Sequence, residues 1–226
     1  MAFKDKLIYK LFGAKLTYSQ CGEDIIIDHI LKNILKLDVI DYLDIGTNHP
    51  RHSNNTYKFY EQGYSGVCIE PNPDLVKLIR KERPRDKCLN IGVSLNEDSQ
   101  TDFFIMNPHT LSTFSEKDAR EFEKEGTHTI SKIIKVKLST INSIISENFE
   151  KCPDVISIDV EGLNEEIALS FDFNRYRPKI FCIETITYSD KNEGKRLNSI
   201  IDYLLNNNYK LYADTNINSI FLDNKY

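Results

Sequence analysis

The chain has 226 residues, of which 40% are hydrophobic, and this length suffices for one domain with a sizeable core. Its net charge of −5 gives no electrostatic reason to expect a nucleic-acid partner, and its five scattered cysteines predict neither a disulfide framework nor a zinc site. We find no apolar run of membrane-spanning length and no signal-peptide core, so we expect a cytoplasmic protein without membrane contact.

The N-terminal residues 1–17 are predicted to form a helical extension, and residues 18–226 a single α/β domain. Residues 3–12 place apolar side chains at helical spacing. A polar turn then leads into a helix with one apolar face. In this turn Ser19 and Gln20 either cap the helix or reach a bound cofactor, and the sequence leaves both interpretations open.

The first predicted strand covers residues 39–45 and is apolar with β-branched members, as expected for a buried parallel strand. It ends on Asp44 and Gly46, an arrangement that lets a ligand approach the backbone of an open α/β sheet. A second strand, residues 66–69, is closed by Glu70, which is placed to accept both hydroxyls of a ribose. The two strand ends together predict a site for an adenosine-containing cofactor.

Helices and strands continue to alternate along the chain. Further helices are expected at residues 54–62, 73–79, 115–126, 195–207 and after a cap at Ser139. Further strands are expected at residues 87–89, 102–106, 133–138, 155–158 and 180–183. The last two strands, 209–213 and 219–222, are too close for a crossover helix and must form an antiparallel hairpin. A mostly parallel seven-stranded sheet with such a C-terminal hairpin is the Rossmann-like architecture of class I methyltransferases.

Five segments of the chain resemble, in order, the successive blocks of one enzyme family. They are YSQCGEDIIIDHIL, YLDIGTNHP, SNNTYKFYEQGYSGVCIEPNP, TLSTFS and ISIDVEGLNEEI. The chain thereby resembles the FkbM-type methyltransferases over residues 18–184, although Thr47 stands where the family usually has a small residue. The resemblance implies S-adenosylmethionine as cofactor and S-adenosylhomocysteine as product. Members of this family methylate hydroxyl groups, often on sugars of surface glycans or on secondary metabolites.

The resemblance also implies which residues bind the cofactor. The first strand end and its loop would line the methionine part, Glu70 would hold the ribose in charge-assisted hydrogen bonds, and the end of the third strand would border the adenine. The predicted cofactor-binding residues are Ser19, Gln20, Asp44, Gly46, Asn48, Asn55, Thr56, Glu70, Pro71, Asn72, Asn90, Ile91, Gly92 and Asp159.

Methyl transfer from a sulfonium is an in-line displacement, so the enzyme must position the acceptor oxygen and help to remove its proton. Asp159, Glu161 and Glu184 end the fourth and fifth strands of the main sheet and could supply the base. They could also hold a divalent ion, but they form no dedicated ligand motif, and we predict no essential metal. The structural alternatives are a helix cap for Glu161 and an ion pair with a lysine for Glu184. His109 in a polar loop is the other candidate base, unless it is simply solvated.

We expect the acceptor to be a sugar hydroxyl on a nucleotide-activated sugar for capsule or lipopolysaccharide biosynthesis, with the polar loop 107–114 as a lid. The alternatives are a secondary metabolite as acceptor, or a non-catalytic module that only binds S-adenosylmethionine. A nicotinamide-dependent oxidoreductase is disfavoured because the loop after the first strand has only Gly46. A nucleic-acid methyltransferase would need an Asn/Asp-Pro-Pro-aromatic block after the fourth strand. A homo-oligomer is one alternative for the quaternary structure, which the sequence leaves open.

Overall fold

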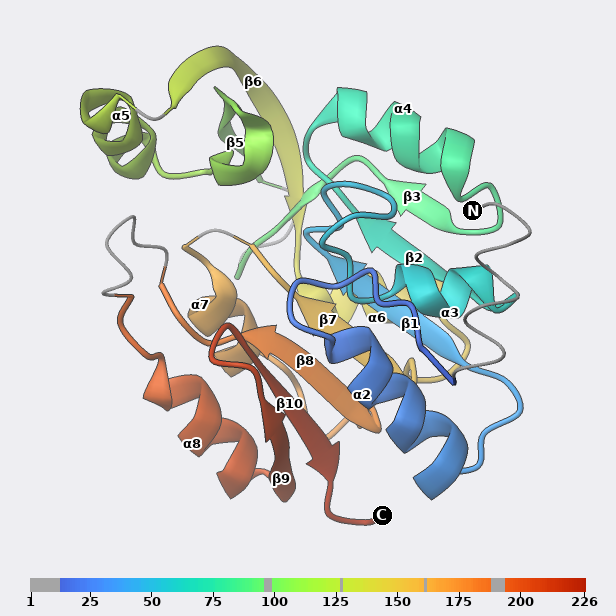
Figure 1. The fold of residues 1–226 in the computed structure, drawn as a ribbon. Coiled ribbons are helices and arrows are strands. Elements are labelled where there is room, and N and C mark those ends of the chain that lie inside the picture. The colour runs from blue at the N-terminus through green and yellow to red at the C-terminus, as the bar shows by residue number, and fades with distance from the viewer. Residues whose placement is uncertain (1–12, 96–98, 127, 161, 188–193) are drawn as a thin grey trace.

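The computed structural model describes residues 13–95, 99–126, 128–160, 162–187 and 194–226. Within these ranges seven strands form one sheet in the order β3-β2-β1-β7-β8-β10-β9 (Figure 1). They are β1 (Asp41–Ile45), β2 (Ser65–Ile69), β3 (Lys87–Leu89), β7 (Val155–Ile158), β8 (Ile180–Glu184), β9 (Tyr209–Asp214) and β10 (Asn218–Asp223). β10 pairs antiparallel with β8 and β9, and the other neighbours are parallel. The predicted α/β fold with a C-terminal antiparallel hairpin is therefore confirmed.

Helices cover both faces of this sheet (Figure 1). One face carries α2 (Glu23–His29), the π-helical turn η1 (Ile30–Ile34), α3 (Tyr57–Glu61) and α4 (Pro73–Glu82); the other carries α6 (Ile141–Asn148), α7 (Asn164–Leu169) and α8 (Asn198–Asn206). Side chains alternate along a strand. Leu43 and Ile45 of β1 therefore enter the core beneath α6–α8, whereas Tyr42 enters the core beneath α2 and α3. The same alternation directs Asp44 toward the α2–α4 side.

A second, smaller group of elements stands out from the sheet at the upper left of Figure 1. It consists of β5 (Gln100–Asn107), the 3₁₀ turn η2 (His109–Leu111), α5 (Glu116–Glu125) and β6 (Thr129–Ser139), and we call these four elements the lobe. β5 and β6 pair antiparallel, and β6 also pairs in parallel with the short β4 (Gly92–Val93) at the base of the lobe. Phe104, Met106 and Ala119 form a hydrophobic cluster of the lobe's own. β5 and β6 extend beyond the predicted ranges 102–106 and 133–138 because they pair along most of their length.

Two helices begin later than the apolar periodicity predicts. α3 begins only at Tyr57. The side chain of Asn54 lies before the helix, and its oxygen accepts hydrogen bonds from the backbone N–H groups of Thr56 and Tyr57. α6 is capped by Thr140, whose hydroxyl oxygen accepts from the N–H group of Ser143 at 3.1 Å. The predicted cap Ser139 is instead the last residue of β6.

α8 begins at Asn198 and not at the predicted residue 195. Arg196 forms an antiparallel bridge with Ile186, and the N–H group of Lys195 donates to the hydroxyl oxygen of Thr187 at 2.9 Å. The residues before α8 are therefore extended and return along the segment that follows β8.

Two further predictions concern the termini and the membrane. The helix expected at residues 3–12 lies outside the described residues, so the division between residues 1–17 and 18–226 stays a prediction. Among the helices of the described ranges, none has both the length and the apolar character that crossing a membrane requires.

Candidate active site

A cavity of about 560 Å³ lies at the carboxyl ends of the parallel strands, between the sheet and the lobe. The structure brings several predicted site residues together in its wall. These are Gln20, Gly46, Asn48, Glu70, Pro71, His109, Asp159 and Glu184. They come from four strand ends, from the turn before α2 and from the lobe, so residues far apart in sequence share one site.

Gly46, directly after β1, is required by its backbone conformation and by a close neighbour. Its φ angle is +83°, and a Cβ atom at this position would overlap the backbone carbonyl of Asp159. The N–H groups of Gly46 and Thr47 both donate to the carbonyl oxygen of Ile69 at 3.1 Å, which fixes the turn to the end of β2. Gly46 also lines the cavity, so close approach of a ligand to its backbone stays a prediction, while the direction of its missing Cβ atom is occupied by the Asp159 carbonyl.

Replacing Gly46 with alanine is expected to lower the free energy of unfolding by ~1–3 kcal/mol or more, because the new methyl group meets both strain and the Asp159 carbonyl. Gly126→Ala is the matched control, since Gly126 has a φ angle of +78° but open space around its Cα atom. Denaturant unfolding should show a clearly larger loss for the first variant. Equal losses would mean that the contact with Asp159 is unimportant.

Glu70, at the end of β2, connects the loop after β1 to the segment after β2. One carboxylate oxygen accepts from the N–H group of Asn48 and the other from that of Asn72, each at 2.8 Å. Burial raises the pKa of Glu70 to about 7, although these two hydrogen bonds oppose the shift. Each carboxylate oxygen keeps a second lone pair for a ligand.

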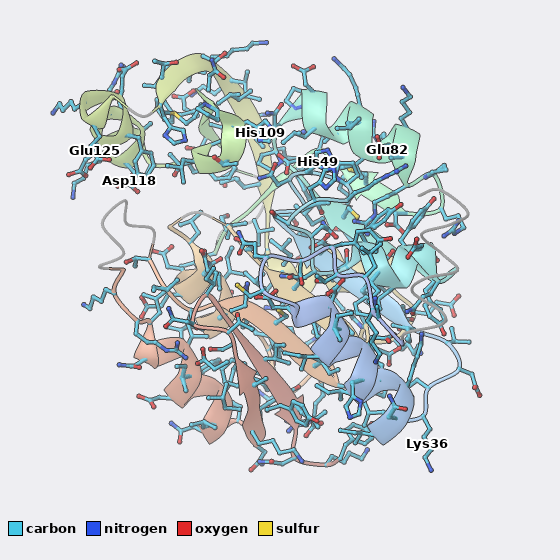
Figure 2. The ribbon with its side chains drawn as sticks, viewed as in Figure 1. Lys36, His49, Glu82, His109, Asp118 and Glu125 are labelled. Atoms are coloured by element: carbon cyan, nitrogen blue, oxygen red, sulfur yellow. The ribbon has the colours of Figure 1, made fainter. Side chains whose placement is uncertain are left out.

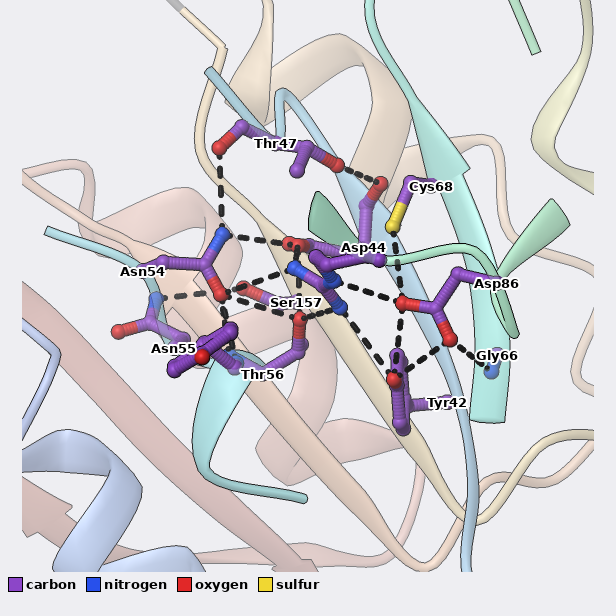
Figure 3. A network of polar contacts seen from close by, with 12 residues as sticks. Tyr42, Asp44, Thr47, Asn54, Asn55, Thr56, Gly66, Cys68, Asp86 and Ser157 are labelled. Carbon is purple, nitrogen blue, oxygen red and sulfur yellow. Dashed lines mark hydrogen bonds and ion pairs between the residues drawn. The ribbon is translucent and has the colours of Figure 1, made fainter. Parts of the chain in front are cut away.

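Asp44 takes part in a buried polar network beneath the loop and does not belong to the described cavity wall (Figure 3). Its carboxylate accepts hydrogen bonds from the amide of Asn54 at 3.1 Å and the hydroxyl of Thr56 at 2.8 Å, and it lies 3.6 Å from the guanidinium of Arg83. Burial raises the pKa of Asp44, and the charge of Arg83 opposes this. Asp44 and Thr56 are thus bonded to each other beneath the loop that follows β1. Asn55 donates a hydrogen bond to the hydroxyl of Ser157 in β7.

Arg83 is the centre of this network and is fully buried. Its Nε–H group donates to Asp86 at 2.7 Å, and another N–H group donates to Thr56 at 2.9 Å. Asp86 also accepts from the hydroxyl of Tyr42 and the backbone N–H group of Gly66. One guanidinium therefore neutralises two buried carboxylates, those of Asp44 and Asp86.

Replacing Arg83 with methionine is expected to lower the free energy of unfolding by ~3 kcal/mol or more, because both carboxylates stay buried without their countercharge. The matched control is Lys81→Met, an exposed position on the preceding helix. Denaturant unfolding followed by circular dichroism measures the difference. A loss no larger than that of the control would show that the network tolerates the missing charge.

The turn before α2 brings one of its two predicted residues to the cavity. Gln20 lines the cavity, whereas the hydroxyl of Ser19 donates to Asp24 at 3.1 Å within the turn. Glu23 fixes the turn to the C-terminal hairpin, since its carboxylate accepts from the hydroxyl of Thr215 at 2.7 Å. The Ser19 hydroxyl oxygen also accepts from the N–H group of Asp24 in the first turn of α2 at 3.3 Å, although the N-cap residue is Gly22. Contact of Ser19 or Gln20 with a cofactor stays a prediction.

Four predicted cofactor-binding residues lie beside the cavity and outside its described wall. They are Asn72, predicted beside Glu70, and Asn90, Ile91 and Gly92, predicted to border the adenine. Asn72 caps α4 by accepting from the N–H group of Asp74. The amide of Asn90 donates to the backbone carbonyls of Glu70 and Pro71, and Ile91 packs against the main core. Gly92 lies so close to the ring of Phe114 that a Cβ atom there would clash. These residues hold the segments after β2 and β3 in place.

Asp159 directly follows β7, Glu184 is the last residue of β8, and both line the cavity. Burial, together with the nearby charges of Asp44 and Glu23, raises the pKa of Asp159 to about 6. The carboxylate of Glu184 accepts a hydrogen bond from the side-chain amide of Asn164 at 2.7 Å. We named an ion pair with a lysine as the structural alternative for Glu184, and this amide contact is a further structural role. The third predicted carboxylate, Glu161, lies outside the described residues.

The described residues contain no group of three or more His, Cys, Asp or Glu side chains that could hold a metal ion. His109, the other candidate base, lies on η2 of the lobe, is exposed and borders the cavity. The two candidate bases therefore come from different parts of the fold, Asp159 from the sheet and His109 from the lobe.

The comparison with protein families decides the assignment of the chain. A family model described as the methyltransferase FkbM domain matches residues 44–211, which include the end of β1, all of β2, β7 and β8, and most of the cavity wall. The chain belongs to the FkbM methyltransferase family. It is thus a methyltransferase that depends on S-adenosylmethionine. No curated protein sequence matches it.

Solved structures similar to this FkbM methyltransferase include a TehB-like SAM-dependent methyltransferase from Corynebacterium glutamicum, with 11% identity, a TM-score of 0.45 and coverage of 97% of this chain and 96% of that one. A putative caffeoyl-CoA O-methyltransferase from Staphylococcus aureus has 12% identity, a TM-score of 0.44 and coverage of 96% and 90%. An O-methyltransferase from Bacillus cereus in complex with SAH has 12% identity, a TM-score of 0.44 and coverage of 96% and 87%.

Several residues of the cavity wall were not predicted from the sequence. They are Ser53, Leu75, Phe103, Ile186, Thr187, Gly194, Asn216 and Ile217. The direction of β9 in the sheet indicates why Asn216 and Ile217 belong to the wall. β10 is antiparallel to both β8 and β9, so β9 runs in the direction of β8 and its following turn lies at the carboxyl edge.

Proposed function

We propose that this FkbM methyltransferase transfers a methyl group to the oxygen of a sugar hydroxyl, on a nucleotide-linked precursor of a surface polysaccharide such as capsule or lipopolysaccharide. The observation that carries the proposal is the position of Asp159, a cavity-lining carboxylate with a raised pKa, opposite a polar segment of the lobe. This arrangement suits an acceptor that loses a proton from a hydroxyl group and is otherwise held by hydrogen bonds.

The wall around the ends of β1 and β2 fits S-adenosylmethionine, which supplies the methyl sulfonium when bound. Glu70 has free lone pairs at the end of β2 for the two hydroxyls of a ribose. Asn48 also lines the cavity, and its side-chain oxygen is buried without a hydrogen-bond partner among the described residues. Such an acceptor is costly unless a ligand donates to it, and an ammonium group of the methionine part would do so.

Asp159 is our candidate for the general base. At a pH above about 6 its carboxylate is ionised and would accept the proton of the acceptor hydroxyl, while the methyl carbon exchanges its bond to the sulfonium sulfur for one to the hydroxyl oxygen and S-adenosylhomocysteine is left. His109 is the second candidate, because it borders the same cavity from the lobe. The chain's contribution to the displacement is then to orient the hydroxyl and take its proton, without a metal ion.

The choice of a sugar rests on the chemistry of the wall opposite the sheet. Thr110 of the lobe and Asn216 of the hairpin turn can hydrogen-bond a polyhydroxylated acceptor. The hydroxyl of Ser112 already donates to the carbonyl of His109 and accepts from the N–H group of Met106. Phe103, Leu75 and Ile186 give the same cavity an apolar part. This apolar part keeps a hydroxylated secondary metabolite as the second candidate acceptor.

The test is an assay of the purified protein with S-adenosylmethionine and a panel of nucleotide-activated sugars, analysed by mass spectrometry for one added methyl group. A panel of hydroxylated secondary metabolites forms the second arm. Methylation on oxygen of a nucleotide sugar would support the proposal. Methylation only of a protein side chain or a nucleobase would contradict it, and binding of S-adenosylmethionine without any turnover would favour the non-catalytic alternative.

A further inference from the structure

The loop between Asn48 and Ser53 is held in an unfavourable backbone conformation at the edge of the cavity. Both residues line the cavity, and their φ angles are +52° and +49°, in the left-handed region that Asn adopts readily but Ser rarely. Glu70 holds the start of the loop through the Asn48 N–H group, and the Asn54 amide donates to the carbonyl of Thr47. Backbone strain of this kind, maintained by surrounding contacts, often occurs at ligand-binding sites.

This strained loop carries two imidazoles in contact with each other. The ring centroids of His49 and His52 are 4.5 Å apart. The Nδ1 atom of His49 accepts hydrogen bonds from the backbone N–H groups of Arg51 at 3.0 Å and His52 at 3.1 Å. Because Nδ1 is the acceptor, the proton of the neutral ring resides on Nε2, which remains a donor for a ligand.

A third imidazole approaches this pair from the lobe. In Figure 2 the side chains of His49 and His109 lie next to one another between α4 and the lobe. Burial lowers the pKa of His49, and the charges of His52 and His109 lower it further. His109 borders the cavity itself. The lowered pKa favours the neutral ring of His49, so this residue offers a ligand its Nε2–H donor.

Arg51 is fixed beside these rings. Its Nε–H group pairs with Glu82 of α4 at 2.6 Å, and its guanidinium lies over the ring of Tyr57. This basic group contrasts with the inner part of the cavity, which is lined by the carboxylates of Glu70, Asp159 and Glu184. Glu82 compensates part of the charge of Arg51, and the remaining N–H groups of the guanidinium are donors for a ligand.

We propose that His49, Arg51 and His52, together with His109 across the opening, form a subsite for a phosphate group of the acceptor. This inference rests on the proposed function and narrows it, because it requires an acceptor that is itself phosphorylated. A phosphate offers several strong acceptor oxygens and negative charge to imidazole and guanidinium donors. With the phosphate held at the opening, the attached sugar extends toward Asp159.

The test measures binding of uridine diphosphate to the complex with S-adenosylhomocysteine by calorimetry, with uridine as the uncharged comparison and glucose 1-phosphate as a phosphate without a nucleoside. His52→Gln should weaken uridine diphosphate binding about tenfold or more, the value of one lost charge-assisted hydrogen bond. His29→Gln is the matched control, because His29 is exposed on α2 and bonds to Asn33. S-adenosylhomocysteine affinity and melting temperature should stay at wild-type values in both variants.

An affinity for uridine diphosphate that is the same in wild type and His52→Gln would overturn the subsite.

The two proposals fail in different ways. If the wild-type protein methylates only hydroxyl compounds without phosphate, and neither uridine diphosphate nor glucose 1-phosphate binds, the subsite is wrong while the O-methyltransferase function stands. If both phosphates bind and His52→Gln weakens them, the subsite is supported even where no sugar is methylated. If His52→Gln lowers the affinity for both uridine diphosphate and glucose 1-phosphate, the recognised part is the phosphate group and not the nucleoside.

Discussion

Replacing Asp159 with asparagine is expected to reduce turnover by ~10²–10⁴ at saturating cofactor, while the affinity for S-adenosylhomocysteine stays near that of the wild type. Asparagine keeps the size of the side chain but cannot accept the acceptor's proton. The wild-type turnover should rise with pH through about 6, because the buried carboxyl group of Asp159 must lose its proton before it acts as a base. The variant should lack this rise.

Two comparison variants make the assignment testable. Glu184→Gln changes the carboxylate at the neighbouring strand end, which accepts from Asn164, and should reduce turnover less than Asp159→Asn. His109→Ala removes the candidate base on the lobe. If Asp159→Asn retains full turnover and His109→Ala loses it, the base is the histidine; if both retain it, neither residue is the base.

Replacing Glu70 with alanine is expected to weaken binding of S-adenosylhomocysteine by ~10²-fold or more. Two charge-assisted hydrogen bonds to the ribose contribute ~1.5–3 kcal/mol each. The structure adds a second cause, because the N–H groups of Asn48 and Asn72 lose their carboxylate partner. The loop that carries Asn48 would then no longer be fixed to the end of β2.

Calorimetry on Glu70→Ala and on Glu70→Gln separates these causes. Glutamine keeps one oxygen acceptor, so it should retain more affinity than alanine. Asp74→Asn, a fully exposed change on α4, is the control for altered charge near the site. Near wild-type affinity in Glu70→Ala would contradict the ribose assignment, provided that circular dichroism shows an intact fold in each variant.

The strand ends could be predicted from the sequence because each follows an apolar run and interrupts it with an acid or a glycine. Glu70 and Asp159 come directly after β2 and β7, and both line the cavity. Asp44 follows the same local pattern but is still inside β1, at its fourth position. Its side chain therefore alternates to the α2–α4 side, where Arg83 lies. A shift of one residue along a strand decides between cavity and core.

Arg83 could not be predicted because its environment is made by residues distant in sequence. The segment KERPRDK around it has the composition of a solvated turn. Its burial depends on Asp44 and Thr56, which β1 and the loop before α3 bring to it across the sheet. His49 and His52 are distant in sequence from His109. That His109 lies near them depends on how the lobe packs against the sheet.

The separate hydrophobic cluster of the lobe has a consequence for how such enzymes diversify. Phe104, Met106 and Ala119 stabilise the lobe from within, while the cofactor wall depends on the core of the main sheet. Changes in the lobe can therefore accumulate without disturbing the ends of β1 and β2. A chimera that exchanges the lobe between two FkbM methyltransferases should keep its cofactor affinity and acquire the acceptor range of the donor.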